Sequence, residues 1–154
     1  MKTSNSNNEL ITKSIFDTAH IIKLKLNAEF EHVGLNGLQA RILRFVKINS
    51  DNGNDIYQKD IETEFKIRRS SVTSVLNTME KNGFITRQSV ESDARLKKIV
   101  LTDKSITFCK EHHQTITEFD NILKKKFTKD EVDTLILLLN KVVKNIEENE
   151  VEIW

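Results

Sequence analysis

The segment from Ile56 to Thr102 constrains the fold of this chain most strongly, because it predicts two short helices followed by a β-hairpin. Residues 58–65 form about two amphipathic helical turns. In residues 69–82 the apolar side chains recur at i, i+3, i+4 and i+7, which places one buried stripe on a second helix. That stripe consists of Val72, Val75, Leu76 and Met79. Gly83 follows where the helix end needs a residue that tolerates positive φ.

Two β-capable runs, 84–90 and 96–101, come next in the chain. The polar residues 91–95 between them are typical of a loop that joins antiparallel strands. Two helices and a hairpin in this order predict a winged helix-turn-helix. The polar face of the second helix bears hydroxyls and an amide, which can donate and accept at base edges in the major groove. These side chains belong to Ser70, Ser71, Thr73, Ser74 and Asn77.

The charge of the chain is concentrated in the same segment. The whole chain has a formal net charge of only +1, but residues 66–98 carry +5 and the remainder is therefore acidic. Such an asymmetry is typical of a local nucleic-acid footprint. We expect the cations outside the polar helix face to anchor phosphates, and we assign this role to Lys66, Arg68 and Arg87. The predicted partner is double-stranded DNA.

The residues before this segment predict two further helices. Residues 10–30 have a helical apolar pattern, and 33–36 interrupt it. Asn36 and Gln39 have the spacing of a capping box that begins the next helix. A Gly/Asn/Asp-rich loop at 50–55 leads to a short strand predicted at 55–57. We therefore place the winged helix-turn-helix DNA-binding domain at residues 36–102.

The residues after the hairpin predict two long helices. Thr102 begins the first, which we expect to run to about Lys126 with inward positions at Ile106, Cys109, Ile116, Leu123 and Phe127. Thr128 and Glu131 form a second capping box, and the helix after it is apolar almost all round. Such a helix is buried on more than one side. Residues 9–32 and 103–148 are accordingly predicted to form a helical dimerisation region built from both termini, which packs against a second copy.

Composition excludes several classes of protein. The chain has no proline, no apolar run of about 18 residues and no signal-peptide pattern, which predicts a soluble cytoplasmic protein without a membrane partner. Its single cysteine excludes an intrachain disulfide and a cysteine-rich zinc site. No phosphate-cradling loop, nucleophile motif or metal-binding quartet occurs, so we expect no enzyme activity, no cofactor and no metal. The adjacent His112 and His113 diverge by about 100° on a helix, which disfavours a shared metal ion.

The segment from Val72 to Ile85 and the wing Asp93-Ala94-Arg95, followed by Val100-Leu101-Thr102, resemble the MarR family of bacterial transcriptional regulators. The resemblance covers about residues 9–147 and implies a mainly α fold with a small β-hairpin wing. Two positions depart from the family pattern: Arg68 stands where the family often has serine, and Ser105 where it often has glycine.

The resemblance implies a homodimer that binds a pseudopalindromic operator, usually as a repressor released by a small and often aromatic ligand. The groove-facing side of the recognition helix would consist of Arg69, Ser70, Ser71, Thr73, Ser74 and Asn77. Arg95 corresponds to a wing arginine that reaches the minor groove, and Asp93 to the acid that orients it. Lys97 and Lys98 belong to the same wing but alternate sides of its strand, so at most one of them is expected to face phosphate.

Some alternatives stay open at this point. The winged helix could bind a protein instead of DNA, or the regulator could act without ligand control. Cys109 could sense oxidants, although its position in mid-helix favours a structural thiol. Four phenylalanines could line an effector pocket or could simply pack in the core: Phe16, Phe30, Phe108 and Phe119.

Overall fold

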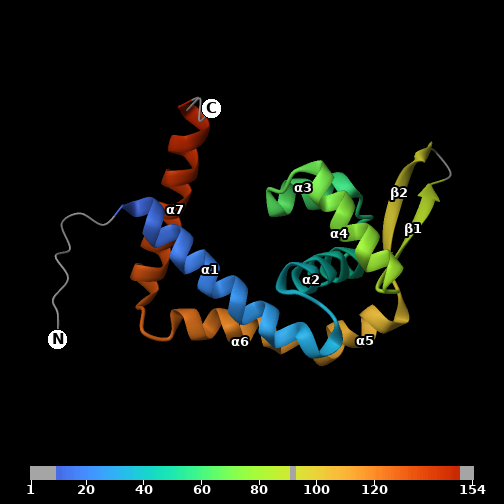
Figure 1. Ribbon diagram of the computed structural model, residues 1–154, viewed down its shortest axis with the longest axis horizontal. Helices are drawn as coiled ribbons and strands as arrows, with labels where there is room; N and C mark the ends of the chain where they lie inside the picture. The colour runs from blue at the N-terminus through green and yellow to red at the C-terminus, as the bar shows by residue number, and fades with distance from the viewer. Residues whose placement is uncertain (1–9, 91–92, 150–154) are drawn as a thin grey trace. The chain divides into compact units, whose positions relative to one another are not determined.

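A computed structural model describes residues 10–90 and 93–149, in which helices dominate and a single two-stranded hairpin is present (Figure 1). The elements are α1 (Ile11–Phe30), the 3-10 turn η1 (Glu31–Val33), α2 (Gly37–Asp51), α3 (Gln58–Phe65), α4 (Arg69–Lys81), β1 (Ile85–Val90), β2 (Asp93–Leu101), α5 (Asp103–Glu111), α6 (His113–Lys124) and α7 (Lys129–Glu148). The predicted fold class is confirmed. The chain divides into two compact units, of which the first ends at Glu111 and the second begins at His112.

The first unit contains the hydrophobic core. Its most completely buried apolar side chains come from α1, α2, α3, α4 and the hairpin: Phe30, Ile42, Leu43, Val46, Ile61, Val72, Leu76, Met79, Ile85 and Ile99. The predicted stripe of α4 is confirmed at Val72, Leu76 and Met79, while Val75 is half-buried. Burial of this stripe turns the opposite face of α4 outward.

Specific backbone signals begin and end these helices. Asn36 and Gln39 form the predicted capping box, with both hydrogen bonds at 2.9 Å. Gly37 allows close packing of α2 on α1, because a Cβ there would lie 2.6 Å from the Cβ of Leu26. Gly83 adopts φ +74° just after α4, as a helix end of this kind requires. These signals fix the start of α2 and the end of α4.

The wing is longer than the sequence predicted. β1 and β2 pair antiparallel, and Val90 lies opposite Asp93 after an irregularity at Ser89/Val90. The predicted loop at 91–95 is therefore wrong for residues 93–95, which belong to β2; Glu91 and Ser92 lie outside the described residues. Polar side chains can extend an exposed hairpin as well as form its loop, so polarity alone placed the start of the second strand too late in the chain. The strand predicted at 55–57 is reduced to a bridge between Tyr57 and Lys98.

The long helix predicted after the wing is interrupted, which is a second correction. α5 ends at Glu111, and His112 leaves the helical region at φ −107° and ψ 16°. The surrounding polar run includes two histidines, whose helix propensity is lower than that of lysine or glutamate. The inward face of α5 is also shifted, because the buried residues are Ser105 and Phe108 instead of Ile106 and Cys109. Phe108 meets the ring of Phe30 edge to face.

The second unit consists of α6 and α7. Thr128 and Glu131 form the predicted capping box of α7. The apolar side chains of α7 are not buried within the single chain, and their predicted burial against a second copy stays a prediction. Those most exposed are Leu135, Ile136, Leu137, Leu138, Leu139 and Ile146. No helix in the described part of the chain is long and apolar enough to cross a membrane.

Candidate nucleic-acid interface

The outer face of α4 presents the polar side chains that the sequence selected for base reading. Arg69, Ser70, Ser71, Ser74 and Asn77 are exposed, and Thr73 is half-buried. They lie outward because the apolar stripe of the same helix is held in the core. The structure therefore brings all six predicted recognition-helix residues to one side of α4. Two of them are already engaged by side chains from neighbouring elements.

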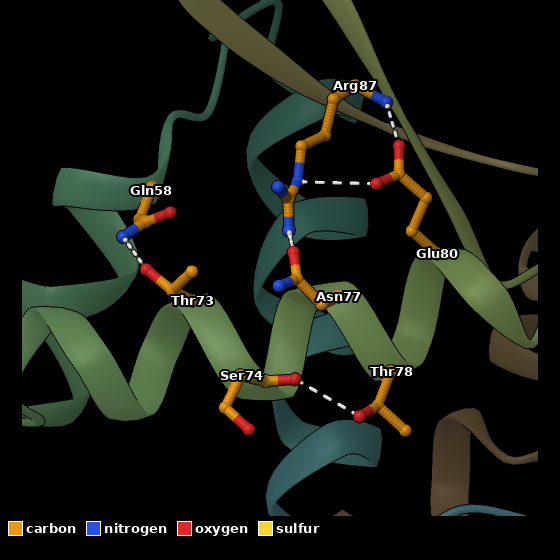
Figure 2. A network of polar contacts seen from close by, with 7 residues as sticks. All are labelled: Gln58, Thr73, Ser74, Asn77, Thr78, Glu80 and Arg87. Carbon is orange, nitrogen blue, oxygen red and sulfur yellow. Dashed lines mark hydrogen bonds and ion pairs between the residues drawn. The ribbon is translucent and has the colours of Figure 1, made fainter.

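Thr73 is bonded to α3 and cannot act as a free hydroxyl. Its Oγ1 donates to the carbonyl oxygen of Arg69 at 2.9 Å and accepts from Gln58 Nε2 at 2.8 Å (Figure 2). Gln58 Nε2 also lies 2.9 Å from an oxygen of Glu62 on its own helix. Gln58 thus fastens the first helix of the helix-turn-helix to the second. The methyl group of Thr73 is therefore the part of its side chain that remains available for an apolar contact with DNA.

Asn77 is bonded to the wing. Arg87 of β1 donates from Nη2 to Asn77 Oδ1 at 2.7 Å. The backbone N–H of Arg87 donates to Glu80 Oε1 at 3.2 Å, and its Nε lies 3.7 Å from Glu80 Oε2. Figure 2 shows these contacts joining the strand to the recognition helix. Arg87 was predicted as a phosphate contact, and the structure directs its guanidinium to α4.

A cleft of about 520 Å³ lies between α3, α4 and the wing. Its lining includes five cationic side chains and a single acid, Glu62, so its electrostatic character is positive. The cations are Lys59, Arg69, Arg87, Arg95 and Lys97. Lys59 was not among the residues predicted from the sequence to contact DNA. It is a cation in the first turn of α3, the helix before α4, and that position is the signal that could have identified it. A concave cationic surface of this kind attracts a polyanion.

The wing residues divide into two groups. Arg95 is exposed, and its backbone N–H donates to Asp93 Oδ1 at 2.9 Å, so the acid orders the chain beside Arg95. Lys97 contacts the hydroxyl of Ser89 within the hairpin. Lys98 forms an ion pair with Asp55 and does not line the cleft. Of the two lysines only Lys97 lines the cleft, and a phosphate contact by either stays a prediction. Lys66 and Arg68, on the turn before α4, are both exposed.

Cys109 is half-buried in α5, away from the cationic cleft. Burial raises the pKa of its thiol to about 11, because desolvation disfavours the thiolate more than nearby Lys47 favours it. The thiolate is the form that reacts with oxidants and disulfides. A raised pKa therefore supports the interpretation of Cys109 as a structural thiol. Within the described ranges no three His, Cys, Asp or Glu side chains are grouped to hold a metal ion.

The thiol of Cys109 is expected to react slowly in the folded protein. At pH 7.5 the raised pKa leaves fewer than roughly one thiol in a thousand ionised. The rate with an aromatic disulfide reagent should rise as pH increases toward 11, and it should rise sharply at pH 7.5 when denaturant unfolds the chain. A native rate equal to the unfolded rate would contradict this assignment.

α3 and α4 form, with the hairpin that follows them, a winged helix-turn-helix. A model of the MarR family matches residues 33–96. The transcriptional regulator BilQ of Clostridioides difficile is 27% identical over 105 residues, which cover 68% of this chain and 70% of that protein. The match confirms the resemblance to the MarR family that the sequence predicted.

Solved structures agree in fold. The S. aureus MepR–DNA complex superposes with a TM-score of 0.82 at 19% identity, covering 90% of this chain and 100% of MepR. The transcription regulator MarR from Oenococcus oeni superposes with a TM-score of 0.76 at 20% identity, covering 88% of this chain and 99% of that one. Both alignments extend well beyond residues 33–96, so the similarity in fold includes the flanking helices.

Proposed function

We propose that this chain is a transcriptional regulator that binds DNA as a homodimer and represses from a pseudopalindromic operator. The observation that carries the proposal is the cationic cleft between α3, α4 and the wing, together with the exposed hydroxyls that the same helix α4 carries. The hydroxyls suit base edges in the major groove and the cations suit phosphates on either side. The names of BilQ as a transcriptional regulator and of the MepR–DNA complex support the same function.

The exposed apolar side chains support the dimer. On α1, Leu24, Ile21 and Phe16 are 54%, 58% and 69% exposed, and on α7 the side chain of Leu138 is 50% exposed. Large exposed apolar side chains, gathered on each of these helices, mark an interaction site. A second copy of the chain is the partner that a two-fold interface requires, and it would set two recognition helices about one DNA turn apart.

A second cleft supports control by a small molecule. It has a volume of about 530 Å³ and lies between α1 and α2, with Ile22, Leu26 and Leu38 among its apolar lining. Lys23 and Arg41 line the same cleft. Apolar walls with two cations suit a small aromatic acid, which packs against the apolar side chains while its carboxylate pairs with a cation. Phe30 and Phe108, by contrast, are core residues.

The two clefts are coupled in the proposed mechanism through the spacing of the recognition helices. A ligand that binds better to a dimer with the wrong spacing shifts the population away from the DNA-binding state. The ligand needs no contact with DNA for this effect, only a difference in affinity between the two states. Repression then ends when ligand concentration exceeds its dissociation constant.

The DNA-binding function is tested by titrating a fluorescent duplex of random sequence with the protein at several salt concentrations. We expect binding at low salt, with log K falling linearly against log salt and a slope of about −3.6 or steeper per protomer if the four cleft cations other than Arg87 contact phosphates. Absence of any duplex affinity at low salt would reject the proposal and favour the protein-binding alternative.

A further inference from the structure

The bond between Arg87 and Asn77 determines which half of the Asn77 carboxamide is available to a ligand. A guanidinium carries only hydrogen-bond donors, so the oxygen of the carboxamide must face Arg87. The observed contact is Arg87 Nη2 to Asn77 Oδ1 at 2.7 Å. Figure 2 shows the Asn77 nitrogen turned away from the guanidinium. The exposed group of Asn77 is therefore its NH2, which only donates.

Arg87 is itself held in this position. Glu80 accepts from the backbone N–H of Arg87 and lies 3.7 Å from its Nε. The side chain of Arg87 is 23% exposed, and that of Glu80 is 41% exposed. The guanidinium of Arg87 therefore hydrogen-bonds Asn77 and lies at ion-pair distance from Glu80, and to reach a phosphate it would have to leave both. Its geometry is that of a positioning residue.

We propose that Arg87 restricts Asn77 to donating a hydrogen bond to purine N7, so that this position of the half-site is read as a purine. An unrestricted asparagine reads adenine with both ends, accepting from N6 and donating to N7. With Oδ1 already accepting from a cation, the contact with adenine N6 is weakened, whereas the donation to N7 is unchanged. Adenine and guanine both carry N7, so the two bases become nearly equivalent. This inference rests on the proposed DNA-binding function.

The test begins with selection of duplexes from a randomised palindromic pool by the unaltered chain and by Asn77→Ala. The base pair whose preference disappears in Asn77→Ala is the one that Asn77 reads. Duplexes with each of the four base pairs at that position are then titrated. For the unaltered chain we expect adenine and guanine to bind within about threefold of each other, and both to bind more tightly than the two pyrimidines.

Arg87→Met keeps the apolar stem of the side chain and removes the guanidinium. We expect it to sharpen the preference for adenine over guanine by about fivefold or more, the discrimination of a bidentate contact. Arg68→Met is the matched control, because it removes the same charge from an exposed position next to α4. It should lower affinity for all four duplexes and leave the adenine-to-guanine ratio unchanged. If Arg87 had only a structural role, Arg87→Met would also leave the adenine-to-guanine ratio unchanged.

Glu80→Ala provides a second route if Arg87→Met does not fold, because it releases Arg87 from an exposed position. It should shift the ratio toward adenine in the same direction and by less. An adenine-to-guanine ratio that is the same in the unaltered chain and in the folded variants would overturn this inference while leaving DNA binding intact. Failure of the unaltered chain to select any duplex would overturn the proposed function, and this inference with it.

Discussion

The double variant Leu135→Asp/Leu138→Asp is expected to be monomeric and to lose at least about 100-fold in affinity for a duplex selected by the unaltered chain. Both side chains are exposed apolar residues of α7 and line one shallow groove with Phe127. Carboxylates on this surface would have to be desolvated in a dimer. Without the dimer each winged helix binds its half-site alone and the avidity of two linked sites is lost. Analytical ultracentrifugation and fluorescence titration measure the two effects.

The control for this variant adds the same charge to the polar side of α7. Asn140→Asp/Lys144→Asn changes the net charge by the same amount at two exposed positions of that helix. It should remain dimeric and bind DNA within a few fold of the unaltered chain. If the apolar-face variant also stayed dimeric, the assignment of α7 to the dimer interface would be incorrect.

The second large effect is expected for Arg95→Ala. Arg95 is exposed on the wing and lines the cationic cleft, and Asp93 orders its backbone. Loss of the guanidinium should weaken operator binding by roughly 5- to 150-fold, as for an arginine in contact with DNA bases. It should also flatten the preference for A·T-rich sequence where the wing meets the narrow minor groove. Titration of duplexes with A·T or G·C pairs at that position measures both.

Lys98→Ala is the comparison for Arg95→Ala within the same strand. Lys98 pairs with Asp55 and does not line the cleft, so its loss should change affinity by less than about threefold. Equal effects of the two variants would mean that the wing contributes only charge. Equal binding by Arg95→Ala and the unaltered chain would place the reading surface elsewhere.

The sequence predicted the features that depend on local spacing. The stripe of Val72, Leu76 and Met79, the Asn36 capping box and the end of α4 near Asn82 all follow from residues within one or two helical turns of each other. These signals are strong because helix periodicity and capping are short-range effects. They were sufficient to predict the winged helix-turn-helix and the polar face of α4.

The features that the sequence did not predict depend on contacts between separate elements. Gln58 reaches Thr73 across 15 positions and Arg87 reaches Asn77 across 10, so no local pattern reveals either bond. The break at His112 was missed because the apolar pattern before and after it can be joined into one helix. The single chain leaves the apolar side chains of α7 exposed. Their predicted burial requires a second copy, which a local pattern cannot specify.

We propose that the segment from Ile56 to Thr102 recognises an operator only when two copies are held at a fixed spacing. The most direct measurement is the mass and affinity of the complex on one selected palindromic duplex, repeated after five base pairs are inserted between the half-sites. We expect two protomers on the original duplex and a large loss of affinity after the insertion, because half-sites must lie about 10 to 10.5 base pairs apart on one face of the DNA. One protomer bound with full affinity, or affinity that does not change with spacing, would contradict it.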